Sequence, residues 1–448
     1  MTNPSSFVSS SRLKSAFALT GLALALSACG GGGGGSDSGY TLGGSVSALT
    51  GDGLILSNDG TTLSVAANAT SFAFPGEQSG SYDVTILSQP ASETCSVVNG
   101  SGGGGNGSVT SVSVQCRPYS VFVADSLGTA ITQFTIGSDG TLTAATPAGI
   151  SVDGEVTALA VSSDGQHAWA NYQDDKTISN LVINSTGQLS LQGTDSEAGS
   201  TSSTGVGLTL SPDGSTLYAA NYAAASISAF SIGSTGIASS IGTPVVSGVN
   251  PYALAVTSDG THLYATNQSD DSISGYTIGS GGSLTPLTTA ATDTSGQGTS
   301  PEGIVANPNS STLYVVLADS AKLVAYNVSA ATGVLTVHTS TTTGTSPRGI
   351  AVTPTGTFLY VTNFGDGTVS GYNLAGGSLT ALSTPTVAAG THPSEVAVSP
   401  DGKYAYVTNT GDNTISQYSI NSASGILSPL SPATVPSGGQ GPIGIAVR

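Results

Sequence analysis

The fold of this chain is decided by residues 346–374, which read SPRGIAVTPTGTFLYVTNFGDGTVSGYNL. Two apolar runs, GIAV and FLYVTN, are joined by the short segment TPTG, and a third run, TVSGYNL, follows the loop FGDG. Short runs rich in β-branched and aromatic residues, separated by Gly, Pro, Asn and Asp, are typical of strands joined by tight turns. This stretch therefore predicts three consecutive strands, which we call the inner, second and third strands.

The same pattern recurs along residues 117–448. Inner strands end at seven positions: Val161, Leu210, Val256, Ala306, Val352, Val398 and Val447. The steps between these ends are 49, 46, 50, 46, 46 and 49 residues. A regular period in the high forties, with four strands in each unit, is typical of a β-propeller.

The two ends of the repeat region predict how the ring closes. The region begins with a second strand, residues 120–125, that has no inner strand before it, and it ends with an inner strand, residues 441–448. Joining the two completes one blade and removes two free sheet edges that would invite aggregation. We therefore predict an all-β chain in which residues 118–448 form a seven-bladed β-propeller, closed by a 3+1 mixed blade.

An asparagine closes the second strand in most of the repeats. Asn side chains often bond the backbone of a turn, so we expect a structural role in capping the following loop rather than a role in ligand binding. The residues concerned are Asn171, Asn221, Asn267, Asn363 and Asn409.

The first 39 residues predict a targeting segment followed by a tether. Arg12 and Lys14 precede an apolar run that ends in LSAC at Cys29 and resembles a bacterial lipobox. This resemblance implies a lipoprotein signal peptide over residues 1–28, with the lipid on Cys29, and an ordinary secretory signal is the alternative. Residues 29–39 then form a glycine-rich flexible tether. Gly30 after the cysteine resembles outer-membrane sorting, so we expect a lipid-anchored protein outside the inner membrane.

Residues 40–117 predict a small β-sandwich domain. Seven short alternating runs lie between turn residues, and the alternation of Tyr82, Val84 and Ile86 points one face of a strand inward. Cys95 and Cys116 are both in this unit, which favours a disulfide formed in an oxidising compartment. A metal site is the less favoured alternative because no histidine lies near either cysteine.

Net charge excludes two classes of partner. The formal net charge is −18, and no basic stripe is present that would neutralise nucleic-acid phosphates or bind an anionic bilayer. We therefore expect membrane attachment through the N-terminal lipid only, no nucleic acid, no cofactor or metal, and a monomer. The expected ligand is an unidentified protein, glycan or small molecule.

The sequence YVTN occurs at residues 360–363 and 406–409, and YATN occurs at residues 264–267. With these motifs the region resembles the YVTN-repeat propellers and the related lactonase family of seven-bladed propellers, which includes 6-phosphogluconolactonase. The resemblance implies a ring-opening site at the mouth of the central channel, with Arg, His and acidic groups at the starts of inner strands. The Pro-Arg-His of that family appears here as Pro347-Arg348-Gly349.

The positions aligned with Arg348 supply the candidate site residues. They are Thr157, Val206, Tyr252, Glu302, Ser394 and Ile443, and none is a histidine. A lactonase needs a group that activates water and a cation that stabilises the developing oxyanion. Glu302 or Glu395 is the candidate base and Arg348 the candidate cation. The nearest histidine is His392.

Two functions remain open at this point. Because histidine is absent from the aligned positions, the sequence favours a lipid-anchored propeller that binds a ligand or protein through Tyr252, Glu302, Arg348, His392 and Glu395. The alternative is a lactone hydrolase of the 6-phosphogluconolactonase type that uses the channel mouth. A third interpretation needs no function, because Glu302 and Arg348 occupy equivalent places in adjacent blades and would form an exposed ion pair of little energetic value.

Overall fold

A computed structural model describes residues 39–90, 92–105, 107–152, 154–172, 177–192, 196–197, 207–288 and 291–448. The predicted signal peptide, the predicted lipidation site at Cys29 and the aligned position Val206 lie outside the described residues. The described residues form strands and two short 3₁₀ turns, η1 (Ser280–Gly282) and η2 (Ala375–Gly377). Within them, no helix has the length and hydropathy needed to cross a bilayer.

The N-terminal region consists of two four-stranded sheets, ordered β4-β1-β8-β6 and β3-β2-β5-β7. Their strands are β1 (Thr41–Ser47), β2 (Leu54–Asn58), β3 (Thr61–Val65), β4 (Ser71–Ala73), β5 (Ser81–Ser88), β6 (Glu93–Val98), β7 (Ser101–Gly103) and β8 (Ser108–Pro118). The sequence predicted seven strands here, and none of them lies in the glycine-rich segment at residues 101–107. That segment instead contains β7, because its backbone pairs with β5 and needs no side chains to do so.

Side chains from both sheets form one hydrophobic core in this region. Tyr82 and Val84 are buried as predicted, while Ile86 is half-buried. Cys95 and Cys116 are directly opposite each other on β6 and β8, and their sulfurs form the predicted disulfide, at 1.98 Å.

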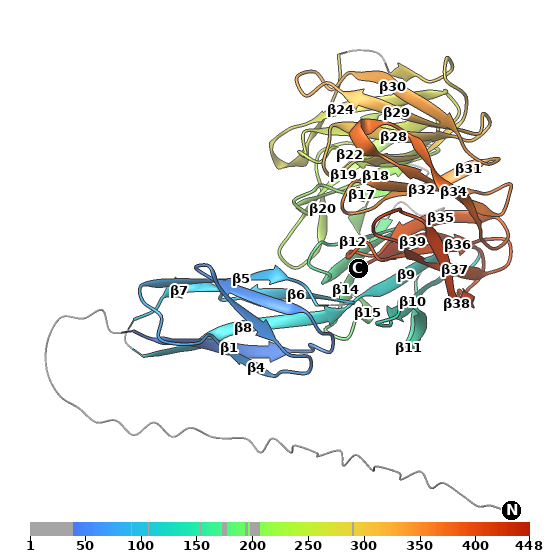
Figure 1. Ribbon diagram of the computed structural model, residues 1–448. Helices are drawn as coiled ribbons and strands as arrows, with labels where there is room; N and C mark the ends of the chain where they lie inside the picture. The colour runs from blue at the N-terminus through green and yellow to red at the C-terminus, as the bar shows by residue number, and fades with distance from the viewer. Residues whose placement is uncertain are drawn as a thin grey trace, which may run out of the picture. The chain divides into compact units, whose positions relative to one another are not determined.

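Residues 120–448 form seven sheets, each of which is one blade (Figure 1). Blade 1 contains β39 (Pro442–Val447), β9 (Ser120–Asp125), β10 (Ala130–Ile136) and β11 (Leu142–Ser151). Blade 2 contains β12 (Val156–Val161), β13 (His167–Tyr172), β14 (Thr177–Ile183), β15 (Leu189–Leu191) and β16 (Ser196–Glu197). Blade 3 contains β17 (Leu208–Leu210), β18 (Thr216–Asn221), β19 (Ser226–Ile232), β20 (Ala238–Ser240) and β21 (Val245–Val246).

The remaining four blades repeat this order. Blade 4 contains β22 (Pro251–Val256), β23 (His262–Asn267), β24 (Ser272–Ile278), β25 (Leu284–Pro286) and β26 (Thr292–Asp293). Blade 5 contains β27 (Pro301–Ala306), β28 (Thr312–Leu317), β29 (Lys322–Val328) and β30 (Leu335–Thr342). Blade 6 contains β31 (Pro347–Val352), β32 (Phe358–Asn363), β33 (Thr368–Asn373) and β34 (Thr380–Ala388). Blade 7 contains β35 (Pro393–Val398), β36 (Tyr404–Asn409), β37 (Thr414–Ile420) and β38 (Leu427–Pro436).

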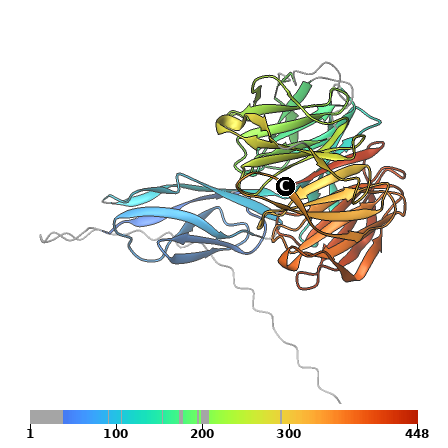
Figure 2. The same cartoon turned by 90° about the horizontal axis from the view of Figure 1, so that it is seen from above.

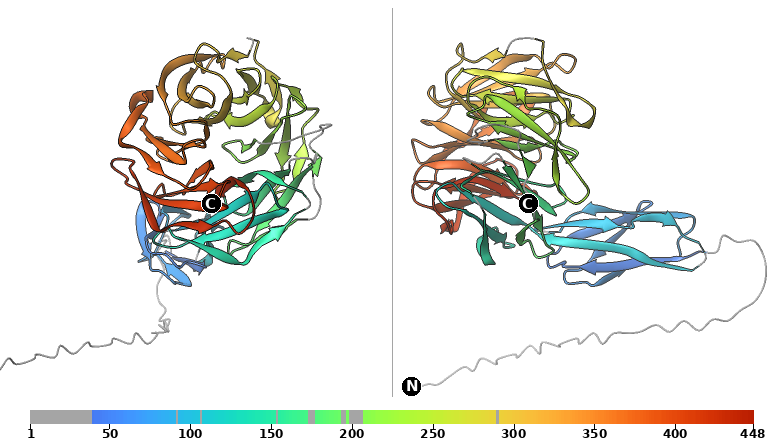
Figure 3. Two further views of the ribbon diagram at one scale, coloured as in Figure 1. Left: turned by 90° about the vertical axis from the view of Figure 1, so that its right-hand side faces the viewer. Right: turned by 180° about the vertical axis from the view of Figure 1, so that it is seen from behind.

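The ring closes in blade 1, as the sequence predicted. The last strand, β39, pairs antiparallel with β9, so that Val447 is opposite Val121 and Pro442 is opposite Asp125. Neighbouring inner strands contact one another around the ring in the order β12, β17, β22, β27, β31, β35 and β39. Figures 2 and 3 show the blades following one another from teal through yellow to red. The 3+1 mixed blade is therefore confirmed.

In five of the seven blades, an aromatic side chain of the second strand joins the blade to the next one. Tyr406 Oη donates to the carbonyl of Gly140 at 2.7 Å and so joins blade 7 to blade 1. Equivalent bonds run from Trp169 to Gly236, Tyr218 to Gly282, Tyr264 to Gly333 and Tyr360 to Gly425. These glycines have positive φ values, and a Cβ at Gly425 would lie 2.3 Å from Phe358. The repeat thus uses a glycine where the backbone conformation and the close approach both demand one.

The YVTN residues hold the inner strands in place. Asn363 Nδ2 donates to Thr368 Oγ1 and Ser370 Oγ, and its Oδ1 accepts from the amide of Gly344, so its role is structural, but it bonds the third strand and the loop before the inner strand rather than the backbone of the following loop. Thr362 Oγ1 accepts from the amide of Gly349 and donates to the carbonyl of Ser394, both at 2.8 Å. One threonine therefore fixes the starts of two adjacent inner strands, where the candidate site residues lie.

Candidate functional site

Three consecutive inner strands place Tyr252, Glu302 and Arg348 at the same level of the ring. Each is the second residue of its inner strand and follows the proline that begins it. After that proline, the pairing of the inner strand with the neighbouring strand of the same blade shifts register. Such β-bulges turn a side chain away from the regular alternation. The start of each inner strand is therefore built to present one side chain at the mouth of the channel.

Arg348 is the centre of this group. Its Nε donates to Tyr252 Oη at 2.6 Å and lies 3.7 Å from Glu302 Oε2. The guanidinium carbon lies 5.8 Å from the ring centroid of Tyr252 and 5.4 Å from that of Phe364. Exposed fractions are 22% for the Arg348 side chain and 14% for the Glu302 side chain, so the pair is partly shielded from water. The ion pair considered from the sequence is present, with two aromatic rings around it.

Two further polar side chains hold Glu302 in position. Gln268 Nε2 donates to Glu302 Oε1 at 2.9 Å, and Tyr222 Oη donates to Gln268 Oε1 at 2.7 Å. Burial raises the pKa of Glu302, and the charge of Arg348 opposes this shift. Since both carboxylate oxygens already have partners, Glu302 is suited to orienting Arg348 rather than to accepting a proton from water.

Glu395 is placed differently from its sequence neighbours. Ser394, which aligns with Arg348, is fully buried, whereas Glu395 lines the central cavity together with Tyr252 and Ile443. The cavity has a volume of about 180 Å³. Burial raises the pKa of Glu395 to about 7, with Arg348 lowering it and Glu302 raising it. A carboxyl group with a pKa near 7 is well matched to general acid–base chemistry at neutral pH.

His392 joins the group only through Phe364. The two rings are stacked, with their centroids 4.6 Å apart and their planes 9° apart. The structure records no bond between His392 and Arg348 or Glu395 among the described residues. Tyr252, Glu302, Arg348 and Glu395 are thus brought together, and His392 lies beside them on the exposed side.

Sequence reasoning missed Tyr222, Gln268 and Phe364. Each directly follows the asparagine that ends a second strand, namely Asn221, Asn267 and Asn363. Because second and inner strands are antiparallel, the end of one lies beside the start of the other, and the next residue reaches the mouth of the channel. Aligning that position across the repeats would have found all three.

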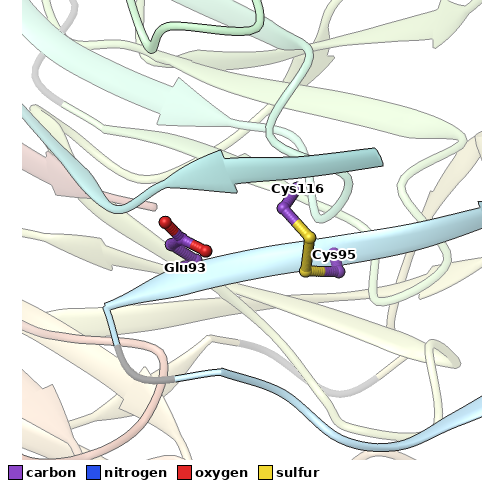
Figure 4. A group of neighbouring side chains, drawn as sticks. All are labelled: Glu93, Cys95 and Cys116. Carbon is purple, nitrogen blue, oxygen red and sulfur yellow. A yellow bond between two sulfur atoms is a disulfide. The ribbon is translucent and has the colours of Figure 1, made fainter. Parts of the chain in front are cut away.

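The described residues contain one group that could hold a metal by its geometry, made of Glu93, Cys95 and Cys116 in β6 and β8 (Figure 4). Both sulfurs are bonded to each other, and the carboxylate of Glu93 accepts a hydrogen bond from the amide of Thr50 at 2.8 Å. The donor atoms are already used, so this group does not fit a metal ion in the disulfide-bonded protein.

Comparison with solved structures finds the same fold in distant proteins. The periplasmic gluconolactonase of Pseudomonas aeruginosa matches with a TM-score of 0.62 and 18% identity, over 73% of this chain and 98% of that one. Proposed 6-phosphogluconolactonases from Bacteroides uniformis and Bacteroides fragilis match with TM-scores of 0.64 and 0.61 and identities of 18% and 19%. These two matches each cover 74% of this chain, and 99% and 98% of the other. None of the curated proteins matches the chain.

A family profile settles the assignment. The profile described as Lactonase, 7-bladed beta-propeller, matches residues 120–251, 244–342 and 336–447. These three overlapping segments extend over the whole ring and most of the chain. The protein therefore belongs to the family of lactonase-like seven-bladed β-propellers.

Proposed function

We propose that the protein is a lactone hydrolase whose active site is the mouth of the propeller channel. The observation that carries the proposal is the position of Glu395, a carboxyl group with a pKa of about 7 that lines the central cavity close enough to Arg348 for their charges to interact. A general base with a cation near it is what lactone opening requires. The comparisons also favour this function over the binding module that the sequence favoured.

The reaction follows from these two groups. Ionised Glu395 takes a proton from a water molecule as the water oxygen bonds to the lactone carbonyl carbon. Arg348 stabilises the negative charge that develops on the carbonyl oxygen, and none of the described residues accepts a hydrogen bond from either of its Nη groups. The ring C–O bond then breaks, and the leaving alkoxide takes the proton back from Glu395. The product is the open hydroxy acid.

Tyr252 and Glu302 act on Arg348 rather than on the substrate. Their contacts are with Nε, at 2.6 Å and 3.7 Å, on one side of the guanidinium. A guanidinium presents five N–H donors in a fixed plane. Fixing one side of this plane directs the remaining donors without any reorganisation during the reaction.

A neutral sugar lactone of the gluconolactone class fits this site better than a phosphorylated one. Two of the similar structures are proposed 6-phosphogluconolactonases, and a third is a periplasmic gluconolactonase. A phosphate dianion needs several cations or amide donors. Arg348 is the one basic group in the described site, and it already has Glu302 and Glu395 near it.

We place the protein outside the inner membrane, anchored by a lipid on Cys29. The disulfide between Cys95 and Cys116 supports an oxidising compartment, and the lipobox-like LSAC supports the anchor. Cys29→Ser is expected to move the protein from the membrane fraction to the soluble fraction after cell lysis. A variant that stays with the membranes would contradict the lipid anchor.

The direct test of the activity is hydrolysis of a panel of neutral aldonolactones, measured by acid release above the spontaneous rate. Wild type is expected to accelerate at least one of them, and Arg348→Ala is expected to lose at least a hundredfold in kcat/KM, as for removal of an oxyanion donor. Lys322→Ala, in blade 5, is the matched control. No acceleration by wild type would leave a ligand-binding module as the better proposal, and full activity in Arg348→Ala would exclude this site.

A further inference from the structure

An open groove of about 440 Å³ lies between blades 6 and 7, on the face where the inner strands begin. It is lined by the loop that follows β32, the loop that precedes β35 and the loop that follows β36. The side chains that matter here are Phe364, Asp366, His392 and Asp412. None of the reaction steps above uses this groove.

Phe364 connects the groove with the active site. Its ring lies 5.4 Å from the guanidinium carbon of Arg348 and 4.6 Å from the ring of His392. A substrate held at Arg348 is therefore only one side chain away from the groove. A substituent on that substrate would have to pass the Phe364 ring to reach the His392 ring.

The backbone at His392 has a conformation that does not call for an imidazole. In the five inner strands that begin with a proline, the residue before that proline has a positive φ, which is 53° at His392. The equivalent residues are Asn250, Ser300, Ser346 and Gly441, with φ between 48° and 60°. Small or amide residues thus satisfy the fold at this position in four other blades, and the exposed histidine ring is extra. Histidine itself tolerates a positive φ, so what distinguishes blade 7 at this position is the exposed ring and not the backbone conformation.

The chemistry of the groove selects a neutral, hydroxyl-bearing ring. Asp412 accepts from the amide of Thr391 at 2.8 Å and Asp366 from that of Thr345 at 2.7 Å. Both carboxylates are exposed and keep lone pairs for ligand hydroxyls. No Lys or Arg lines the groove, so an anionic ligand is disfavoured. The stacked Phe364 and His392 rings offer an apolar face to the C–H groups of a sugar.

We propose that this groove is a subsite for a second sugar ring, so that the substrate class is a neutral aldonolactone that carries a glycosyl substituent. The lactone ring lies at Arg348 and Glu395, and the glycosyl ring lies against His392 with its hydroxyls toward Asp412. This inference rests on the proposed function for its reaction and on the groove for its specificity.

The test compares kcat/KM for gluconolactone with kcat/KM for the lactones of cellobionic, maltobionic and lactobionic acids. For at least one disaccharide lactone, wild type is expected to show a preference of about tenfold, as one aromatic contact provides. His392→Ser places there the residue that blades 5 and 6 use, and it is expected to lower this ratio to near one by raising KM. His338→Ser, an exposed histidine on β30, is the control and is expected to keep the wild-type ratio.

Two outcomes overturn the subsite while leaving the hydrolase intact: wild type prefers gluconolactone to every disaccharide lactone, or His392→Ser keeps the wild-type ratio. If no lactone is hydrolysed, the proposed function fails, and titration calorimetry with glucose, cellobiose, maltose and lactose then decides the groove by itself. Tighter binding of a disaccharide than of glucose, lost in His392→Ser, supports the subsite. Equal or absent binding of all four sugars contradicts it.

Discussion

Glu395 and Asp125 are two acidic side chains of the same ring, and burial raises the pKa of each to about 7. Their surroundings differ. Glu395 lines the central cavity, and the charges of Arg348 and Glu302 act on it. Asp125 is completely buried at the end of β9, where the ring closes, and neither of its carboxylate oxygens has a hydrogen-bond partner among the described residues.

Asp125 occupies the position that asparagine holds in other blades. In blade 7, Asn409 Nδ2 donates to Thr414 Oγ1 and Ser416 Oγ. The equivalent of Ser416 in blade 1 is Thr132, whose hydroxyl also has no partner. The raised pKa of Asp125 therefore results from burial of a carboxyl group that has no hydrogen-bond partner, and it does not identify a functional site. At Glu395 the cavity and the neighbouring cation give the same pKa a chemical use.

The largest expected effect separates the two residues by activity. Glu395→Gln keeps the size of the side chain but removes the base, so kcat/KM for a hydrolysed lactone is expected to fall by about 10²–10⁴. The same measurement on Asp125→Asn is expected to match wild type, because Asp125 does not line the cavity. Activity retained by Glu395→Gln would remove Glu395 from the mechanism.

The second expected effect distinguishes Asp125 from Glu395 by the pH dependence of the free energy of unfolding. An Asp has a pKa of about 4 in an unfolded chain, and that of Asp125 is about 7 in the folded protein. Between these values the folded state holds a proton that the unfolded state releases, so the free energy of unfolding falls as pH rises from about 4 to about 7 and then levels off. We expect Asp125 to contribute about 2–4 kcal/mol to this fall.

Asp125→Asn is expected to abolish that contribution and to be more stable than wild type above pH 7, because its amide is able to donate as Asn409 does. Denaturant unfolding at pH 5 and pH 8 measures the difference. The control is Asp366→Asn, which changes an exposed acid whose pKa is lowered by bonds from Thr345. Identical pH dependence in wild type and Asp125→Asn would show that Asp125 is not the titrating group.

Much of the ring was predictable from the repeat. The incomplete units at residues 120–125 and 441–448 predicted the closing blade, and the alignment of inner strands placed Arg348 beside Glu302. The two N-terminal sheets were less predictable, since β7 pairs through backbone alone in a stretch of glycines. A strand is recognised in a sequence by its alternation of apolar and polar side chains, so a strand such as β7, which pairs only through its backbone, is not detected.

The site was predictable only in part. Gln268 and Phe364 lie in loops just beyond the second strands, so the strand patterns alone did not select them, although the repeat places each directly after an asparagine. The pairing of β35 shifts register as it does in blades 4 to 6, but here the second residue, Ser394, is buried and the third, Glu395, lines the cavity, which the alignment alone did not predict. A pKa raised by burial depends on packing between blades that are distant in sequence, and no local pattern reports it.

The most direct test of the central claim is the pH profile of kcat/KM for a neutral aldonolactone, measured in wild type and in Asp125→Asn. If Glu395 is the general base, kcat/KM rises about tenfold per pH unit below an apparent pKa of about 7 and is constant above it, and both proteins give the same profile. A wild-type profile that is flat between pH 5 and pH 8, or one that Asp125→Asn abolishes, would contradict the account.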